Sequence, residues 1–156
     1  MIQYVIGDAT NPLAKGQKII AHVCNDIGKW GAGFVMALSA KWPNTRVDYL
    51  DWYKRNDGFG LGRVLYVRVR PDIWVANMVA QAGTKTGSKG PPIRYDALDK
   101  CLADLATSAE DHNASIHMPR IGCGLAGGKW ESVEPILKKN LAHLNVMVYD
   151  LGTRRG

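Results

Sequence analysis

The stretch from Met118 to Leu125 reads MPRIGCGL and joins the end of a predicted strand to a loop rich in glycine. Residues 115–118 form a short apolar run that predicts a strand, and Pro119 ends it. Residues 121–128 predict a loop, and residues 130–144 repeat apolar side chains at the spacing of an amphipathic helix. A strand, a glycine-rich loop and a helix are therefore expected in direct succession.

The same order occurs earlier in the chain. Residues 18–23 (KIIAHV) predict a strand, residues 25–33 hold three glycines, and residues 34–41 predict a helix that Pro43 ends. Glycine lets backbone N–H groups converge on an anion, and the following helix N-terminus favours negative charge. Two such loops predict a cleft for a phosphate-bearing ligand at the carboxyl ends of the strands. Neither loop matches a P-loop or a GxGxxG motif, and ordinary tight turns remain the alternative.

The rest of the chain alternates between strand and helix patterns. Further strands are expected over residues 3–6, 63–70, 73–80 and 146–150, and further helices over residues 46–55 and from Pro92 onward. Residues 46–55 place Val47, Leu50 and Tyr53 or Lys54 on one helical face. Alternating elements predict an α/β fold with a central sheet covered on both faces, and the hairpin within residues 63–80 makes that sheet mixed. One domain is expected over residues 1–151, followed by a loose tail over residues 152–156.

Composition excludes several classes of protein. The 156 residues include 46% hydrophobic and 22% charged residues, which excludes a disordered chain, and the glycines follow no collagen-like period. No apolar run is long enough for a transmembrane helix, and the start of the chain lacks the pattern of a signal peptide, so a cytoplasmic protein is expected. The three cysteines predict no disulfide framework. The net charge of +6 suggests an anionic partner.

Three ordered motifs resemble those of the macrodomain family. They are GDAT at residues 7–10, AHVCN at residues 21–25 before GAG at residues 31–33, and MPRIGCGL before KWE at residues 129–131. The set is most similar to the terminal ADP-ribose glycohydrolase-like branch, whose members hydrolyse ADP-ribosyl-glutamate and ADP-ribosyl-aspartate esters, and to its actinobacterial relatives. The resemblance runs from Tyr4 to Tyr149. It implies a three-layer α/β/α sandwich with a mixed sheet.

The resemblance also implies a ligand and partners. The ligand would be ADP-ribose and the partners ADP-ribosylated proteins, with no metal, organic cofactor or membrane involved, no nucleic acid expected, and a monomeric protein. Asp8 would accept a hydrogen bond from the adenine amino group, with Tyr149 beside the adenine pocket. Asn25 would approach the distal ribose. The remaining ligand-binding residues implied by the motifs are Ala9, Gly31, Ala32, Gly33, Gly122, Cys123, Gly124, Leu125 and Ala126.

Two positions depart from the branch. The lysine and the aspartate that serve a covalent mechanism in the branch correspond here to Gln81 and Ala126. An amide cannot form the imine that a lysine forms with an opened sugar. The expected reaction is therefore attack of water at the anomeric carbon of the distal ribose, with Gln81 and Asn25 as candidate catalytic residues that orient water or ribose hydroxyls. A non-catalytic ADP-ribose reader, or a phosphatase or deacylase acting on a free ADP-ribose derivative, are the alternatives.

Other groupings of reactive or charged residues are weaker candidates for a functional site. Lys85 or Lys129 could replace the missing lysine, although loop lysines near a diphosphate are more often counter-charges. Cys123 could act as a nucleophile with His22 or His117 as base, but a cysteine packed into a tight loop is more common. A zinc site would need Cys24, Cys123, His22 and His117, which lack the usual spacing. The basic residues Lys85, Lys89, Arg94, Arg154 and Arg155 are interpreted as a rim around an anionic ligand rather than a nucleic-acid surface.

Overall fold

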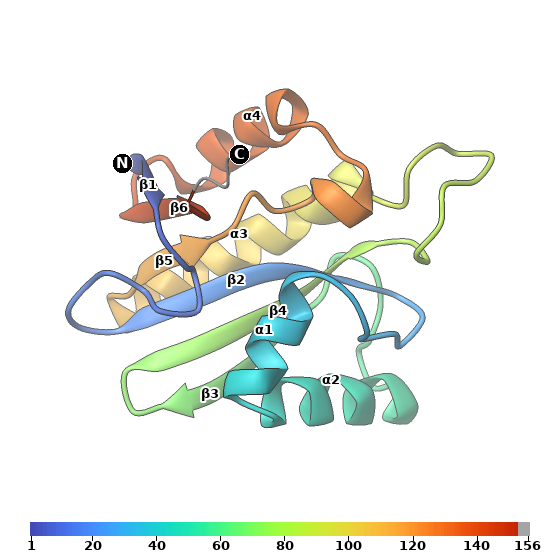
Figure 1. Cartoon of the computed structure of the whole chain (residues 1–156), viewed down its shortest axis with the longest axis horizontal. Helices are drawn as coiled ribbons and strands as arrows, with labels where there is room; N and C mark the ends of the chain where they lie inside the picture. The colour runs from blue at the N-terminus through green and yellow to red at the C-terminus, as the bar shows by residue number, and fades with distance from the viewer. Residues whose placement is uncertain (153–156) are drawn as a thin grey trace.

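The computed structural model describes residues 1–152 and contains one six-stranded sheet with the strand order β1-β6-β5-β2-β4-β3 (Figure 1). Neighbouring strands run parallel, except that β3 and β4 form an antiparallel hairpin, so the predicted mixed sheet is confirmed. The strands are β1 (Ile2–Ile6), β2 (Lys18–Asn25), β3 (Val64–Arg70), β4 (Ile73–Gln81), β5 (Ser115–Met118) and β6 (Val146–Asp150).

Helices cover both faces of the sheet, as Figure 1 shows. They are α1 (Phe34–Lys41), α2 (Asn44–Arg55), α3 (Tyr95–His112) and α4 (Trp130–Leu141). The alternation along β2 explains the layers, because successive side chains of a strand point to opposite faces. Ile19 and Ala21 belong to the core under α3 and α4, whereas Ile20 and Cys24 belong to the core under α1 and α2. The expected three-layer α/β/α sandwich is therefore confirmed.

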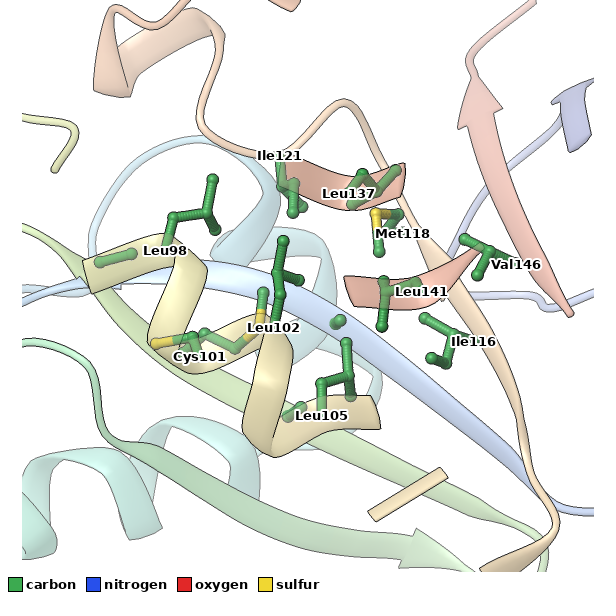
Figure 2. Packing of buried hydrophobic residues seen from close by; sticks show 14 of the residues in the cluster. Leu98, Cys101, Leu102, Leu105, Ile116, Met118, Ile121, Leu137, Leu141 and Val146 are labelled. Atoms are coloured by element: carbon green, nitrogen blue, oxygen red, sulfur yellow. The ribbon is translucent and has the colours of Figure 1, made fainter. Parts of the chain in front are cut away.

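The larger core lies between the sheet and the pair α3 and α4. Leu98, Leu102 and Leu105 repeat on one face of α3 and are fully buried. Figure 2 shows them facing Leu137 and Leu141 of α4, with side chains of β5 and β6 alongside. This layer fixes α4, and with it the loop that leads from β5 into α4.

The predicted element bounds agree closely with the structure. The bounds of α1, β5 and β6 coincide with the prediction, α3 begins at Tyr95 after its prolines, and α4 ends at Leu141. The loop over residues 121–128 contains a short 3₁₀ turn, Gly124–Ala126. Residues 153–156 are outside the described residues, and most of the predicted tail, with Arg154 and Arg155, lies there. Within residues 1–152, no helix is both long and apolar enough to cross a bilayer.

The predicted apolar face of α2 is not its most buried face. Val47 is 56% exposed and Tyr53 is 40% exposed. The side chains that α2 buries are instead those of Thr45, Tyr49 and Trp52. Both sets follow helical spacing, but the second set removes two large aromatic rings from water, which contributes more stabilisation than burying Val47.

The topology opens a crevice between β2 and β5. The chain leaves β2 towards α1 on one face of the sheet, and it leaves β5 towards α4 on the other face. The loops that follow two neighbouring parallel strands therefore diverge at their carboxyl ends. Ligands of open α/β sheets bind at such a switch point.

Candidate ligand-binding cleft

A cleft of about 580 Å³ lies at the carboxyl ends of β2, β4 and β5. It brings together Asn25, Gln81 and every residue that was predicted from the two glycine-rich loops. The lining residues are His22, Val23, Cys24, Asn25, Lys29, Gly31, Ala32, Gly33, Phe34, Val35, Gln81, Thr84, Pro119, Arg120, Ile121, Gly122, Cys123, Gly124, Leu125 and Ala126. The structure thus places residues separated by about a hundred positions around one cavity.

The residues expected beside adenine lie outside this lining. Asp8 and Ala9 follow β1, at the same carboxyl ends of the parallel strands as the cleft. Asp8 is exposed and Ala9 is buried. The Oδ1 of Asp8 accepts hydrogen bonds from the backbone N–H of Thr10 at 2.9 Å and from its hydroxyl at 2.8 Å. Asp8 is therefore held in a turn with its second carboxylate oxygen outside that turn.

Tyr149 belongs to the core rather than to the cleft surface. Only 3% of the surface of Tyr149 is exposed. The Tyr149 hydroxyl accepts a hydrogen bond from the backbone N–H of Leu13 at 2.8 Å and lies 2.7 Å from Nδ1 of His117. Tyr149 thus fastens the loop after β1 to the sheet, which shapes the region around Asp8 without exposing an aromatic face.

The side chain of Asn25 shapes the first loop. Its Oδ1 accepts hydrogen bonds from the backbone N–H groups of Ile27 at 3.1 Å and Lys29 at 3.0 Å, and its Nδ2 donates to the carbonyl of Lys29 at 2.7 Å. The buried hydroxyl of Tyr49 lies 2.6 Å from the carbonyl and 3.0 Å from Oδ1 of Asn25. One amide hydrogen of Asn25 has no acceptor among the described residues and could bind a ligand.

Glycine is required where the first loop packs on α2. Gly28 has φ +71°, and a Cβ there would lie 2.5 Å from the ring of Tyr53. A side chain at this position would therefore push the loop off the helix. The result is a tight turn that aims residues 29–33 at the cleft.

The second loop is closed by its own backbone. The N–H of Gly128 donates to the carbonyl of Gly122 at 2.8 Å, and a Cβ on Gly128 would lie 2.3 Å from that oxygen. The two loops come together at one point, where Leu125 approaches Gly33. They therefore border the cleft from opposite faces of the sheet.

The charge of the lining favours an anion. Lys29 and Arg120 are basic, and among residues 1–152 no aspartate or glutamate lines the cleft. Arg120 is paired with Asp150 through two hydrogen bonds of 2.7 and 2.9 Å, and its guanidinium lies about 5 Å from the rings of Tyr4 and Trp130. Lys85 and Lys129, the alternative lysines, are exposed and do not line the cleft.

Histidine and cysteine chemistry is disfavoured in the cleft. Burial lowers the pKa of His22 to about 4, and its Nε2 contacts Oδ1 of Asn77, so the ring is neutral near pH 7. Burial raises the pKa of the Cys24 and Cys123 thiols, which keeps both protonated. His117 bonds to Ser115 and Tyr149 away from the cleft. Among residues 1–152, no three His, Cys, Asp or Glu side chains are grouped closely enough to hold a metal ion.

Gln81 is the last residue of β4, and one polar atom of its side chain forms a hydrogen bond. Its Nε2 donates to the carbonyl of Gly83 at 3.0 Å, whereas its Oε1 accepts no hydrogen bond from the described residues. Asp26 supports the same turn, since its N–H donates to the carbonyl of Gln81 at 2.9 Å and its Oδ1 accepts from the N–H of Gly83 at 2.8 Å. Gln81 therefore offers a free acceptor at the cleft.

Sequence reasoning missed several lining residues. Lys29 lies within the first glycine-rich loop and Arg120 directly precedes the second, so a basic side chain next to glycines could have indicated both residues. Phe34 and Val35 begin α1, and Thr84 follows β4. Nothing in the local pattern distinguishes these three from ordinary core or loop residues, because their role depends on which strand ends meet.

Comparisons with known proteins identify relatives of this chain. Residues 21–137 match the family model described as Macro domain. The chain is 31% identical to an ADP-ribose 1''-phosphate phosphatase of Candida albicans over 95% of this chain and 99% of that protein. It is 34% identical to a chromodomain-helicase-DNA-binding protein 1-like of Danio rerio over 99% of this chain, but this chain spans only 16% of that protein.

Solved structures show the same fold. A protein of unknown function from Bacteroides thetaiotaomicron superposes with a TM-score of 0.94 at 53% identity, covering 97% of this chain and 98% of that one. A macrodomain protein from Streptomyces coelicolor superposes with a TM-score of 0.87 at 47% identity, covering 97% of this chain and 100% of that one. With its mixed sheet, its two facing glycine-rich loops and its match over residues 21–137, the chain belongs to the Macro domain family.

Proposed function

We propose that this macrodomain binds ADP-ribose in the cleft and hydrolyses the ester that joins ADP-ribose to a glutamate or aspartate of a protein. The observation that carries the proposal is the cleft itself, which combines two glycine-rich loops with Lys29 and Arg120 and has no carboxylate side chain from the described part of the chain in its lining. Converging backbone N–H groups and basic side chains favour a diphosphate. A nucleoside at one end would reach Asp8, and the distal ribose at the other end would reach Asn25 and Gln81.

The proposed reaction is attack of water at the anomeric carbon of the distal ribose. The bond between that carbon and the carboxylate oxygen breaks, and the carboxylate leaves with the bonding electron pair. The water oxygen becomes the new hydroxyl at that carbon, and its second proton is released to solvent. A carboxylate is a good leaving group, so orientation of the water can contribute much of the rate without a strong base. The free Oε1 of Gln81 is suited to accept a hydrogen bond from that water or from a ribose hydroxyl. The remaining amide hydrogen of Asn25 would hold the ribose.

A second candidate function is removal of phosphate from ADP-ribose 1''-phosphate. The relative from Candida albicans that bears this activity in its name aligns over nearly its whole length. Both reactions release a group from the same end of ADP-ribose, so the same cleft could accept either substrate. A reader that binds ADP-ribose without releasing anything is the third candidate, and the absence of the branch lysine and aspartate at Gln81 and Ala126 is consistent with it.

One assay separates the three candidates. The protein is incubated with a glutamate-linked ADP-ribosylated protein and, separately, with ADP-ribose 1''-phosphate, and free ADP-ribose is measured. Release from the protein substrate is expected, and Gln81→Ala should lower that rate about ten- to a hundredfold with little change in ADP-ribose affinity. Release from the phosphate alone would establish the phosphatase, and tight binding without release would establish the reader.

The mechanism predicts that no covalent sugar adduct forms. Borohydride reduces a lysine imine to a stable adduct, so intact-mass measurement after borohydride treatment during turnover should find the mass of the protein unchanged. A mass increase located on Lys85 or Lys129 would contradict water attack and identify a relocated nucleophile. Serine-linked ADP-ribose should be the poorer substrate, because an alkoxide leaves less readily than a carboxylate and needs a general acid.

The proposal includes the partners of the protein. ADP-ribosylated proteins are the expected partners rather than nucleic acid. The basic side chains of Lys29 and Arg120 line the cleft, where they would bind a small anionic ligand. The protein is expected to act as a monomer. Light scattering at micromolar concentration checks the mass, and a salt-sensitive complex with single-stranded RNA would contradict the choice of partner.

A further inference from the structure

We infer that a second depression, beside the cleft, receives the polypeptide that carries the ADP-ribose. This inference rests on the proposed function and names the surface that would recognise the protein part of the substrate. The depression has a volume of about 620 Å³ and lies at the carboxyl end of α2 and in the turn that follows it. Its lining residues, called the α2 depression below, are Asp26, Tyr53, Lys54, Asn56, Phe59, Gly60 and Leu61.

The α2 depression shares a wall with the cleft. Asn25 lines the cleft, and the next residue, Asp26, lines the depression. The backbone and carboxylate of Asp26 bond to Gln81 and Gly83 as described, so a lining residue of the depression contacts a lining residue of the cleft at the end of β4. The wall between them is the turn over residues 26–29, which packs at Gly28 directly on the ring of Tyr53.

The proposed orientation of ADP-ribose in the cleft places the linked polypeptide on the side of the α2 depression. Asn25 and Gln81 would hold the distal ribose, which is the end that bears the ester. Asp8 and the adenine end lie beyond β5 and β6, about three strand spacings or roughly 14 Å from β2. A polypeptide linked to the distal ribose would therefore leave the cleft between Asn25 and Gln81, next to Asp26, and not over the β1 edge.

The surface chemistry of the depression suits a peptide segment. Tyr53 and Leu61 are 40% and 42% exposed, and Ile27 in the turn over residues 26–29 is 38% exposed, so apolar area is available on this side of the molecule. Lys54 is exposed and forms no ion pair within residues 1–152. The carboxylate of Asp26 already accepts the N–H of Gly83. We therefore expect an acidic segment with one apolar side chain against Leu61 and Tyr53 and a carboxylate near Lys54.

Binding measurements test the inference without requiring turnover. The probe is an acidic peptide with leucine next to a glutamate that carries ADP-ribose through a non-hydrolysable linkage, compared with free ADP-ribose by calorimetry. The wild-type protein should bind the peptide at least about tenfold more tightly than free ADP-ribose, which corresponds to about 1.4 kcal/mol. The double variant Lys54→Glu, Leu61→Ser should lose most of that gain and keep its affinity for free ADP-ribose.

A matched control is available in Lys15→Glu. Lys15 is exposed and lies near the start of β2, whereas the cleft lies at the carboxyl ends of the strands. The same charge change there should leave the peptide affinity unchanged. Equal affinities of the wild-type protein for the peptide and for free ADP-ribose would overturn the docking inference alone. Equal losses in the double variant and in Lys15→Glu would overturn it too. Failure of the wild-type protein to bind free ADP-ribose would overturn the proposed function, and this inference with it.

Discussion

At the scale of single residues, the polar side chains beneath the cleft decide its shape. Tyr49 is fully buried, and its hydroxyl bonds to Asn25, which in turn organises the first loop. Tyr49→Phe should destabilise the protein by about 1–3 kcal/mol, because it leaves a buried acceptor without its donor. ADP-ribose affinity should also fall, since the loop loses its anchor. Urea denaturation and calorimetry measure both quantities.

Tyr53→Phe is the control for this prediction. The Tyr53 side chain lies on the same helix, but it is 40% exposed and its hydroxyl forms no hydrogen bond within the described residues. Its removal should change neither stability nor affinity for free ADP-ribose appreciably. Equal effects of the two variants would show that the Tyr49 hydroxyl does not support the loop.

Two buried histidines make stability depend on pH. Burial lowers the pKa of His22 and of His117 to about 4, below the ordinary value of 6.5. Between these values the unfolded chain binds more protons than the folded protein, so stability is complete above about pH 6.5 and is lost as the pH falls towards 4. Each histidine should contribute about 3 kcal/mol to this loss. Equal free energies of unfolding at pH 4.5 and pH 6.5 would contradict it.

At the scale of elements, the two glycine-rich loops should hold the diphosphate. Gly31 allows a clean test, because its backbone has no left-handed φ and a Cβ there meets nothing within 4 Å. Gly31→Glu should leave thermal stability unchanged but abolish detectable ADP-ribose binding, since a like charge next to a diphosphate costs several kcal/mol. Gly31→Gln is the matched control for size. Retained binding by the glutamate variant would remove this loop from the site.

Gly124 would be a less direct position for the same test. It has φ +63°, so any side chain there is strained, although space is open around it. Gly124→Glu should therefore lose binding and also lose about 1–2 kcal/mol of stability. The comparison between Gly31 and Gly124 separates the effect of negative charge in the cleft from the effect of backbone strain.

At the scale of the whole molecule, the net positive charge should make the affinity for ADP-ribose depend on salt concentration. The chain carries a formal charge of +6, and Lys29 and Arg120 reach the cleft. Raising the ionic strength from about 0.1 M to about 1 M shortens the Debye length from about 10 Å to about 3 Å. The dissociation constant for ADP-ribose should therefore rise several-fold, and Lys29→Gln should weaken that dependence. An affinity independent of salt would contradict an electrostatic contribution from these residues.

The sequence by itself determined the elements of the fold and the residues of both glycine-rich loops. The bounds of α1, β5 and β6 follow from local periodicity and from breakers such as Pro43 and Pro119, which act within a few residues. The motifs were sufficient to identify the family and to group Asn25 with the loops, and the correspondence with the lysine of the resembled branch added Gln81. These are properties of short segments, so no knowledge of distant contacts was needed.

Only the tertiary structure decided which side chains line the cleft. It buries Tyr49 and leaves Val47 exposed, keeps Tyr149 in the core, and commits most of the hydrogen-bonding capacity of Asn25 to its own loop. It also places Asp26 between the cleft and the α2 depression. These outcomes depend on which strand ends meet across the sheet and on how much apolar area each alternative removes from water, and neither quantity is contained in the local pattern of residues.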